Sequence, residues 1–203
     1  MNEKLIKAVT NNVSKQFTYK KLLGRYKLAI KSEFYFEAMI IVYAMLEDRL
    51  RSMLYYTGVL ANREKLSLHK KTKIQVRDIV AIYQKDSKIR LKNITGKIHV
   101  IKALLTWSIE CENVEDKYLL LLKSTLESID VGAILETLDL LGCWLKYRNE
   151  VIHASMNKDI ESLFSDLHEK VEEGMRYARI IDSQATILRK KSLIRKKMNM
   201  GNN

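Results

Sequence analysis

The absence of proline is the feature that most limits what this chain can fold into. Its 203 residues contain no proline and only seven glycines. Glycine and proline mark the turns of β-rich folds, and proline also breaks helix interiors. Long, uninterrupted helices are therefore favoured, and we predict an all-α helical bundle.

Two segments have apolar residues at the three- and four-residue steps of an amphipathic helix. In residues 33–57 the apolar residues are Met39, Tyr43, Leu46, Leu50 and Met53. In residues 131–154 they are Ile134, Leu138, Leu141, Leu145 and Ile152. A third long helix is expected between a cap at Asn157 and about residue 188. The periodicity thus predicts the main helices of a single domain over residues 1–188.

The limits of some helices follow from turn and cap residues. Ser32 is a candidate N-cap for the helix in 33–57, Gly58 is a candidate stop, and Gly24 is a candidate break in the preceding segment. The stretch "KIRLKNITGKIHVI", residues 88–101, alternates apolar and basic residues around Thr95-Gly96. It fits either a short hairpin or the end of one helix and the start of another.

The net charge of +12 is concentrated in two places. Residues 62–102, which we treat as a basic insert, hold twelve Lys and Arg against three acids, and the tail 189–203 holds six Lys and Arg and no acid. Such concentration indicates a polyanionic partner, and RNA is the candidate we favour. The expected RNA contacts are Lys70, Lys71, Lys73, Arg77, Arg90, Lys92, Arg189, Lys190, Lys191, Arg195, Lys196 and Lys197.

Other features bear on location and cofactors. Cys111 and Cys143 lie in apolar contexts, which favours a reducing, cytoplasmic location over a disulfide framework. The N-terminal segment has no apolar core of signal-peptide length, and no apolar run approaches the ~20 residues of a membrane span. We therefore expect no membrane partner. His69, His99 and His168 form no metal-ligand set, and no glycine-rich phosphate loop is present, so we also expect no metal and no cofactor.

The stretch "KYRNEVIHAS", residues 146–155, places polar side chains beside an apolar stripe. On a helix, Arg148 and His153 lie roughly 60° and 80° to opposite sides of Leu145, with Asn149 inside the His153 edge. Glu47 lies at the edge of the stripe in 33–57, where it could pair with Arg148 or orient it if the two helices pack together. These residues are either polar edges of a helix end or a catalytic device.

The segment "RNEVIH" resembles the R-x4–6-H motif of the HEPN superfamily of small α-helical domains, including the asparagine after the arginine. Its setting, after an earlier helix with an acid at the stripe edge and before another long helix, is similar over roughly residues 33–188. The resemblance implies a HEPN-like bundle with a metal-independent RNA endonuclease activity, a toxin or anti-phage role, a homodimer with a composite site, and an antitoxin or other regulatory protein as partner.

In this interpretation His153 acts as base or acid, because imidazole titrates near neutral pH. Arg148 holds the phosphate with its planar guanidinium, Asn149 orients the histidine or donates to a phosphate oxygen, and Glu47 supports Arg148. The alternative is a non-catalytic helical module that binds RNA or a protein through the basic insert and tail.

Overall fold

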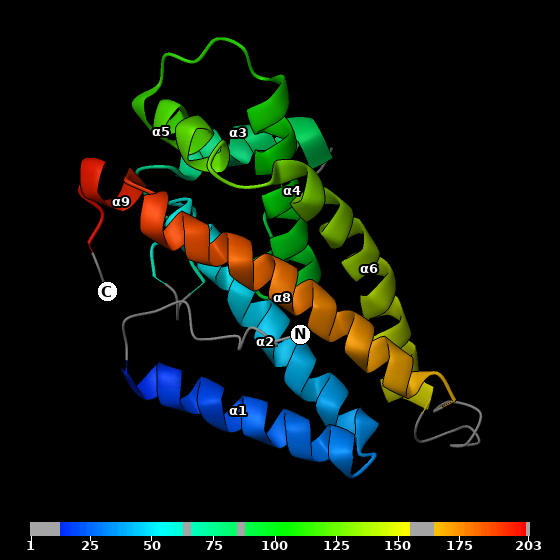
Figure 1. The fold of residues 1–203 in the computed structure, drawn as a ribbon. Helices are drawn as coiled ribbons and strands as arrows, with labels where there is room; N and C mark the ends of the chain where they lie inside the picture. Colours follow the sequence, from blue (N-terminus) through cyan, green and yellow to red (C-terminus); the bar gives the residue numbers. More distant parts are fainter. Residues whose placement is uncertain (1–12, 63–65, 85–87, 155–164, 202–203) are drawn as a thin grey trace.

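The computed structural model describes residues 13–62, 66–84, 88–154 and 165–201. Every regular element within these ranges is a helix, apart from an isolated antiparallel bridge between Leu60 and Leu68. The predicted all-α fold is therefore confirmed (Figure 1). The helices are α1 (Val13–Lys31), α2 (Tyr35–Tyr56), α3 (Lys73–Gln84), α4 (Ile94–Glu110), α5 (Lys117–Leu126), α6 (Val131–Ala154), α8 (Leu167–Lys191) and α9 (Ile194–Lys197).

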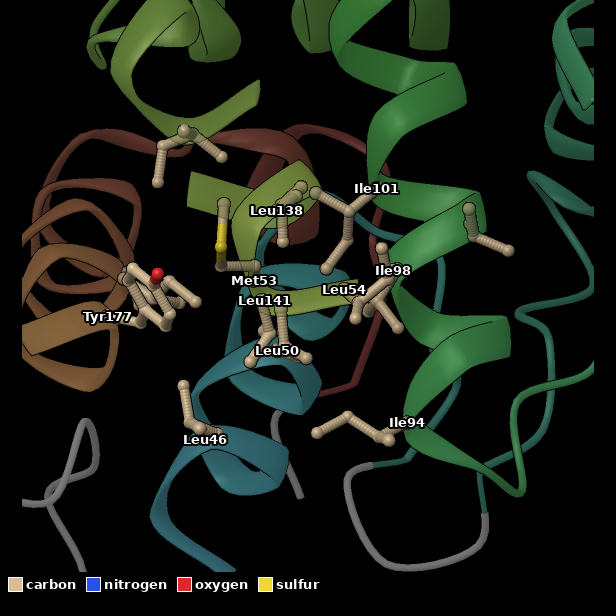
Figure 2. Packing of buried hydrophobic residues seen from close by; sticks show 14 of the residues in the cluster. Leu46, Leu50, Met53, Leu54, Ile94, Ile98, Ile101, Leu138, Leu141 and Tyr177 are labelled. Carbon is tan, nitrogen blue, oxygen red and sulfur yellow. The ribbon is translucent and has the colours of Figure 1, made fainter. Parts of the chain in front are cut away.

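Helix α2 lies at the centre of the bundle. It packs against α8 along most of its length and against α1 and α4 on other sides, while α6 packs against α4 and α8 (Figure 1). Leu50 and Leu54 of α2 are fully buried and meet Ile98 of α4 and Leu141 of α6 in the core (Figure 2). Each fully buried leucine of this kind contributes about 1.5–3 kcal/mol to folding. Most residues of the two predicted apolar stripes therefore lie in the core of the bundle, whereas Tyr43 and Ile152 are only half-buried.

The connection between α1 and α2 differs from the expected one. Helix α1 continues through Gly24 without a break. The backbone N–H of Ser32 donates to the carbonyl of Leu28 (2.9 Å), so Ser32 closes α1 instead of capping α2. Glu33 has a positive φ of 59°, which turns the chain sharply, and Phe34 takes the N-cap position of α2. Gly58, with a φ of 77°, follows α2 as predicted.

The basic segment forms helices instead of a hairpin at Thr95-Gly96. Helix α4 begins at Ile94, and the side chain of Asn93 accepts a hydrogen bond from the backbone N–H of Gly96 (2.7 Å). A Cβ at Gly96 would lie 1.7 Å from the carbonyl oxygen of Arg90. Only glycine, which has no Cβ, therefore allows the backbone at Arg90 to lie this close to the first turn of α4. Residues 88–93 lie outside any helix, so only the start of a helix, at Ile94, is confirmed of the helical alternative for 88–101. Helix α4 packs within the core against α2, α3 and α6.

The basic tail folds back onto the end of α2. Ile194 and Met200 are buried, and Arg195 has only 7% of its surface exposed. The Arg195 guanidinium stacks on the ring of Tyr55 at 3.9 Å and donates to the carbonyl oxygens of Leu60 (3.0 Å) and Gly201 (2.6 Å). The sequence predicts that Arg195 contacts RNA, but in the structure its guanidinium is buried. It binds these two carbonyl oxygens and the tyrosine ring instead.

Candidate functional site

Arg148 of α6 contacts α2 through the ring of Tyr43. The guanidinium carbon lies 4.2 Å from the ring centroid, which is within the range of a cation–π interaction. Nη1 of Arg148 donates to Oδ1 of Asn149 (3.0 Å), while its buried Nε has no hydrogen-bond partner. Within the described part of the chain, no carboxylate lies at ion-pair distance from Arg148. Among the described residues, the positive charge of this half-buried arginine is therefore not neutralised by a carboxylate.

Glu47 lies one helical turn after Tyr43, on the same face of α2. Its Oε1 accepts hydrogen bonds from Nζ of Lys97 (3.0 Å) and from Nη2 of Arg51 (3.2 Å). The sequence suggested that Glu47 could pair directly with Arg148, but the structure does not show this ion pair. Arg148 stacks on the ring of Tyr43 instead. Glu47 and Arg148 nevertheless both act on the electrostatics of Tyr43.

Lys97 is the buried member of this cluster. None of its surface is exposed, although it lies in the first turns of α4. Besides Glu47, its ammonium group donates to the carbonyl oxygens of Lys92 (3.4 Å) and Asn93 (3.3 Å). A buried charge needs such partners, because leaving it unpaired costs several kcal/mol. Lys97 therefore fixes the start of α4 against the Glu47 side of α2.

The cluster as a whole is positively charged. Two cations, Arg51 and Lys97, hold the carboxylate of Glu47, and Arg148 adds a third positive charge at Tyr43. Burial raises the pKa of the Tyr43 phenol, and the negative charge of Glu47 raises it further, while Arg148 acts in the opposite direction. Tyr43 therefore keeps its proton at neutral pH and can donate a hydrogen bond. A half-buried, net positive surface with a hydroxyl donor is suited to an anion.

Asn149 and His153 extend from this cluster toward the end of α6. Both side chains are exposed to solvent. His153 lies five residues after Arg148, which places it about 7.5 Å further along the helix axis and roughly 140° around it. Within one chain, therefore, helix geometry sets the imidazole and the guanidinium on different sides of α6. The residues that follow, 155–164, lie outside the described part, as does the expected cap at Asn157.

The expected RNA contacts are spread over two regions. In the basic segment, the side chains of Lys70, Lys71, Lys73, Arg77, Arg90 and Lys92 are exposed. In the tail, Lys190, Lys191, Lys196 and Lys197 are exposed, Arg189 is half-buried and Arg195 is buried. Nζ of Lys71 donates to the carbonyl oxygen of Met198 (2.7 Å), so this lysine also joins the two regions. The structure thus brings the start of α3 and the folded tail together.

Three members of the cluster were not expected from the sequence: Tyr43, Arg51 and Lys97. A signal was present for two of them. Tyr43 precedes Glu47 by four residues, which places both on one helical face. Lys97 lies between Ile94, Ile98 and Ile101, and a lysine within an apolar stripe indicates a buried partner. Arg51 has no comparable signal, because an arginine four residues after a glutamate is common on exposed helices.

The described residues contain no group of three or more His, Cys, Asp or Glu side chains that could hold a metal ion. Nor does any helix among them have the length and apolarity required to cross a membrane. Comparisons with family models, curated proteins and solved structures found no match for this chain.

Proposed function

We propose that this protein is a metal-independent RNA endonuclease of the HEPN type, with Arg148 and His153 as its main catalytic residues. The observation that carries the proposal is the state of Arg148. Its guanidinium stacks on Tyr43 and has no carboxylate partner among the described residues. An arginine that is positioned but not neutralised is suited to hold a phosphate.

The proposed reaction uses the nucleophile that RNA itself carries. The 2′-hydroxyl loses its proton to a general base and attacks the adjacent phosphorus, and the bond from phosphorus to the 5′-oxygen breaks. The leaving 5′-oxygen takes a proton from a general acid. The products are a 2′,3′-cyclic phosphate and a 5′-hydroxyl. Positive charge on the phosphorane lowers the barrier, and this is the role of Arg148, while Asn149 holds Nη1 of that arginine.

His153 is the proton-transfer group in this mechanism. Its imidazole is exposed to solvent near the end of α6, and histidine is the side chain that most often serves as general acid or base. One motif supplies one histidine, whereas the reaction needs both a base and an acid. We therefore place the active site between two copies of the chain, so that two motifs face one scissile phosphate. Light scattering should then report a dimer under the conditions in which RNA is cut.

Glu47 has a supporting role in the proposal. It does not pair with Arg148, but it lies beside Tyr43 and is held by Lys97 and Arg51. Its carboxylate therefore holds α2 against the start of α4, close to the point where Arg148 stacks on Tyr43. The biological role that we propose is that of a cytoplasmic toxin or anti-phage effector under the control of an antitoxin or other regulatory protein. This part of the proposal rests on the resemblance of "RNEVIH" to the HEPN motif.

A non-catalytic RNA- or protein-binding module is the second candidate. The exposed cations at the start of α3 and before α4 favour it, since they suit binding whether or not a reaction follows. The two candidates differ in what happens to the bound RNA. A binding module leaves the strand intact, whereas the proposed enzyme divides it at a ribose.

The test is an assay with end-labelled RNA in the presence of EDTA. We expect fragments that end in a 2′,3′-cyclic phosphate and begin with a 5′-hydroxyl. A matched oligonucleotide with a single 2′-deoxy residue at the main cleavage site should resist cutting there and only there. Cutting of the 2′-deoxy position, or complete inhibition by EDTA, would contradict the proposed chemistry.

A further inference from the structure

A cleft of about 640 Å³ lies between the loop before α3 and the segment that leads into α4. Small-molecule sites have volumes of roughly 300–1,000 Å³, so the cleft is large enough for a nucleotide. Its walls come from both halves of the basic segment. Lys73 begins α3, and Asn93 caps α4, so the N-terminal ends of two helices border it.

The residues that line the cleft are of two kinds. Lys73, Arg90 and Lys92 are cationic and exposed, and none of the described residues that line the cleft is acidic. The helix N-termini add partial positive charge at the same place. Leu66, Leu68 and Ile89 supply apolar walls that remain half exposed. An apolar surface with a cationic rim fits a molecule that has a flat, weakly polar part and a negatively charged part.

The cleft adjoins the cluster around Glu47. Lys92 and Asn93, which line it, offer their carbonyl oxygens to Nζ of Lys97. The same ammonium group donates a hydrogen bond to Glu47. Glu47 lies one helical turn after Tyr43, the residue on which Arg148 stacks. One buried lysine thus links the wall of the cleft to the proposed catalytic surface.

We propose that this cleft is a nucleotide-binding subsite for single-stranded RNA. The base lies against Leu66, Leu68 and Ile89, and Lys73 and Lys92 neutralise the adjoining phosphates. The identification of the ligand as RNA rests on the proposed function. The subsite itself goes beyond it, because it assigns to the chain a preference for bases in addition to phosphates.

Binding of a probe that cannot be cut tests the proposal. The probe is a fluorescent 2′-O-methyl RNA decamer, compared with an abasic decamer of equal length and charge. Wild-type protein should bind the base-containing probe roughly tenfold more tightly, because a base that lies against the apolar walls removes apolar surface from water. Ser67 lines the cleft and is exposed, so Ser67→Trp should fill the cleft and remove this preference. An abasic probe that binds as tightly as the normal one would overturn the proposal, as would an unchanged preference in S67W.

Two exposed lysines provide a second readout that does not depend on the tryptophan variant. The double variant Lys73→Ala, Lys92→Ala should weaken binding of both probes and reduce the salt dependence by roughly 0.7 in log–log slope for each lysine. Lys20→Ala, Lys27→Ala removes two exposed lysines of α1 as a matched control and should leave the slope unchanged. Equal effects of the two double variants would show a diffuse charge effect and contradict the subsite.

These results are independent of cleavage, because the probe lacks the nucleophilic hydroxyl. A base preference that S67W removes would leave the subsite standing even if natural RNA is never cut. Cleavage of natural RNA without a base preference would remove the subsite and leave the nuclease proposal intact.

Discussion

At the residue scale, the position of Arg148 depends on the ring of Tyr43. If the ring holds the guanidinium, Tyr43→Phe should keep most of the RNA cleavage activity, whereas Tyr43→Leu should lose about tenfold, the upper range of a cation–π contact. Single-turnover rates for the two variants measure the difference. Equal losses in both variants would show instead that the hydroxyl is required, and equal activity would show that the stack has no role.

Asp48 is a second residue whose environment makes a measurable prediction. Burial acts to raise the pKa of its carboxyl, but Lys15, the hydroxyl of Tyr19 and Arg49 together lower it below the ordinary value of 3.8. The Tyr19 hydroxyl donates to Oδ2 over 2.8 Å. A depressed pKa in the folded state adds stability that is fully present above the unfolded pKa and is lost as the pH falls through the folded value.

Asp48→Asn should therefore lower the free energy of unfolding by about 1.5–3 kcal/mol at pH 7, as expected for hydrogen bonds to a charged group. The difference from wild type should stay constant down to about pH 5 and shrink below about pH 4. Urea unfolding at a series of pH values measures it. A difference that grows as the pH falls would contradict this account of Asp48.

At the scale of elements, the contact between α6 and α8 depends on a glycine. The indole Nε1 of Trp144 donates to the carbonyl oxygen of Lys170 (2.6 Å), and a Cβ at Gly174 would lie 2.6 Å from the indole ring. Gly174→Ala should therefore destabilise the protein by about 1–3 kcal/mol through overpacking. Gly142, in the middle of α6, has open space at its ideal Cβ: apart from its own helix backbone, no described atom lies within 4 Å.

Gly142→Ala is thus the matched control and should stabilise the protein by up to about 1 kcal/mol, because alanine is the better helix former. Thermal and urea unfolding of the two variants compare them directly. Opposite signs are expected, and destabilisation by both to the same extent would show that the α6–α8 contact does not depend on Gly174.

The elements also show what the sequence could predict. Helices α2 and α6 follow from their apolar periodicity, because each buries a continuous stripe in the core. The same projection places Arg148 at a stripe edge, where it contacts Tyr43 of α2. The residue at which α4 begins could not be predicted. Gly96 looks like a turn residue in the sequence, but glycine is required there because the Arg90 carbonyl lies close to it, a contact that no local pattern reveals. The burial of Lys97 could not be predicted for a similar reason, since its partner Glu47 is 50 residues away in the sequence.

At the scale of the whole molecule, the tail and the end of α2 form one structure. Ser192 Oγ donates to the carbonyl of Tyr56 (2.6 Å), and Arg195 stacks on Tyr55. Arg195→Ala should lower the free energy of unfolding by about 2–4 kcal/mol, because buried carbonyls lose a charged donor. Lys196→Ala, at an exposed neighbour, should change it by less than about 0.5 kcal/mol. Equal stability of the two variants would contradict the docked tail.

Charge and fold together determine how the molecule would engage RNA. The exposed cations of the basic segment border a cleft that Lys97 connects to Glu47, while Arg148 stacks on Tyr43, one helical turn before Glu47. The catalytic claim depends on the two ends of the "RNEVIH" segment, one half-buried against α2 and the other exposed at the end of α6. Substitution of either residue leaves no large core cavity, so activity and folding can be measured separately.

The most direct measurement is the single-turnover cleavage rate of end-labelled RNA, in EDTA, for wild type, Arg148→Ala, His153→Ala and the control Lys146→Ala. Lys146 is exposed on the same helix, so its removal tests for a general effect of charge. We predict that the rate falls by ~10²–10⁴ in R148A and H153A, with unchanged helical circular dichroism and dimer mass, and stays near wild type in K146A. Cleavage by R148A and H153A at the wild-type rate would contradict the proposed ribonuclease.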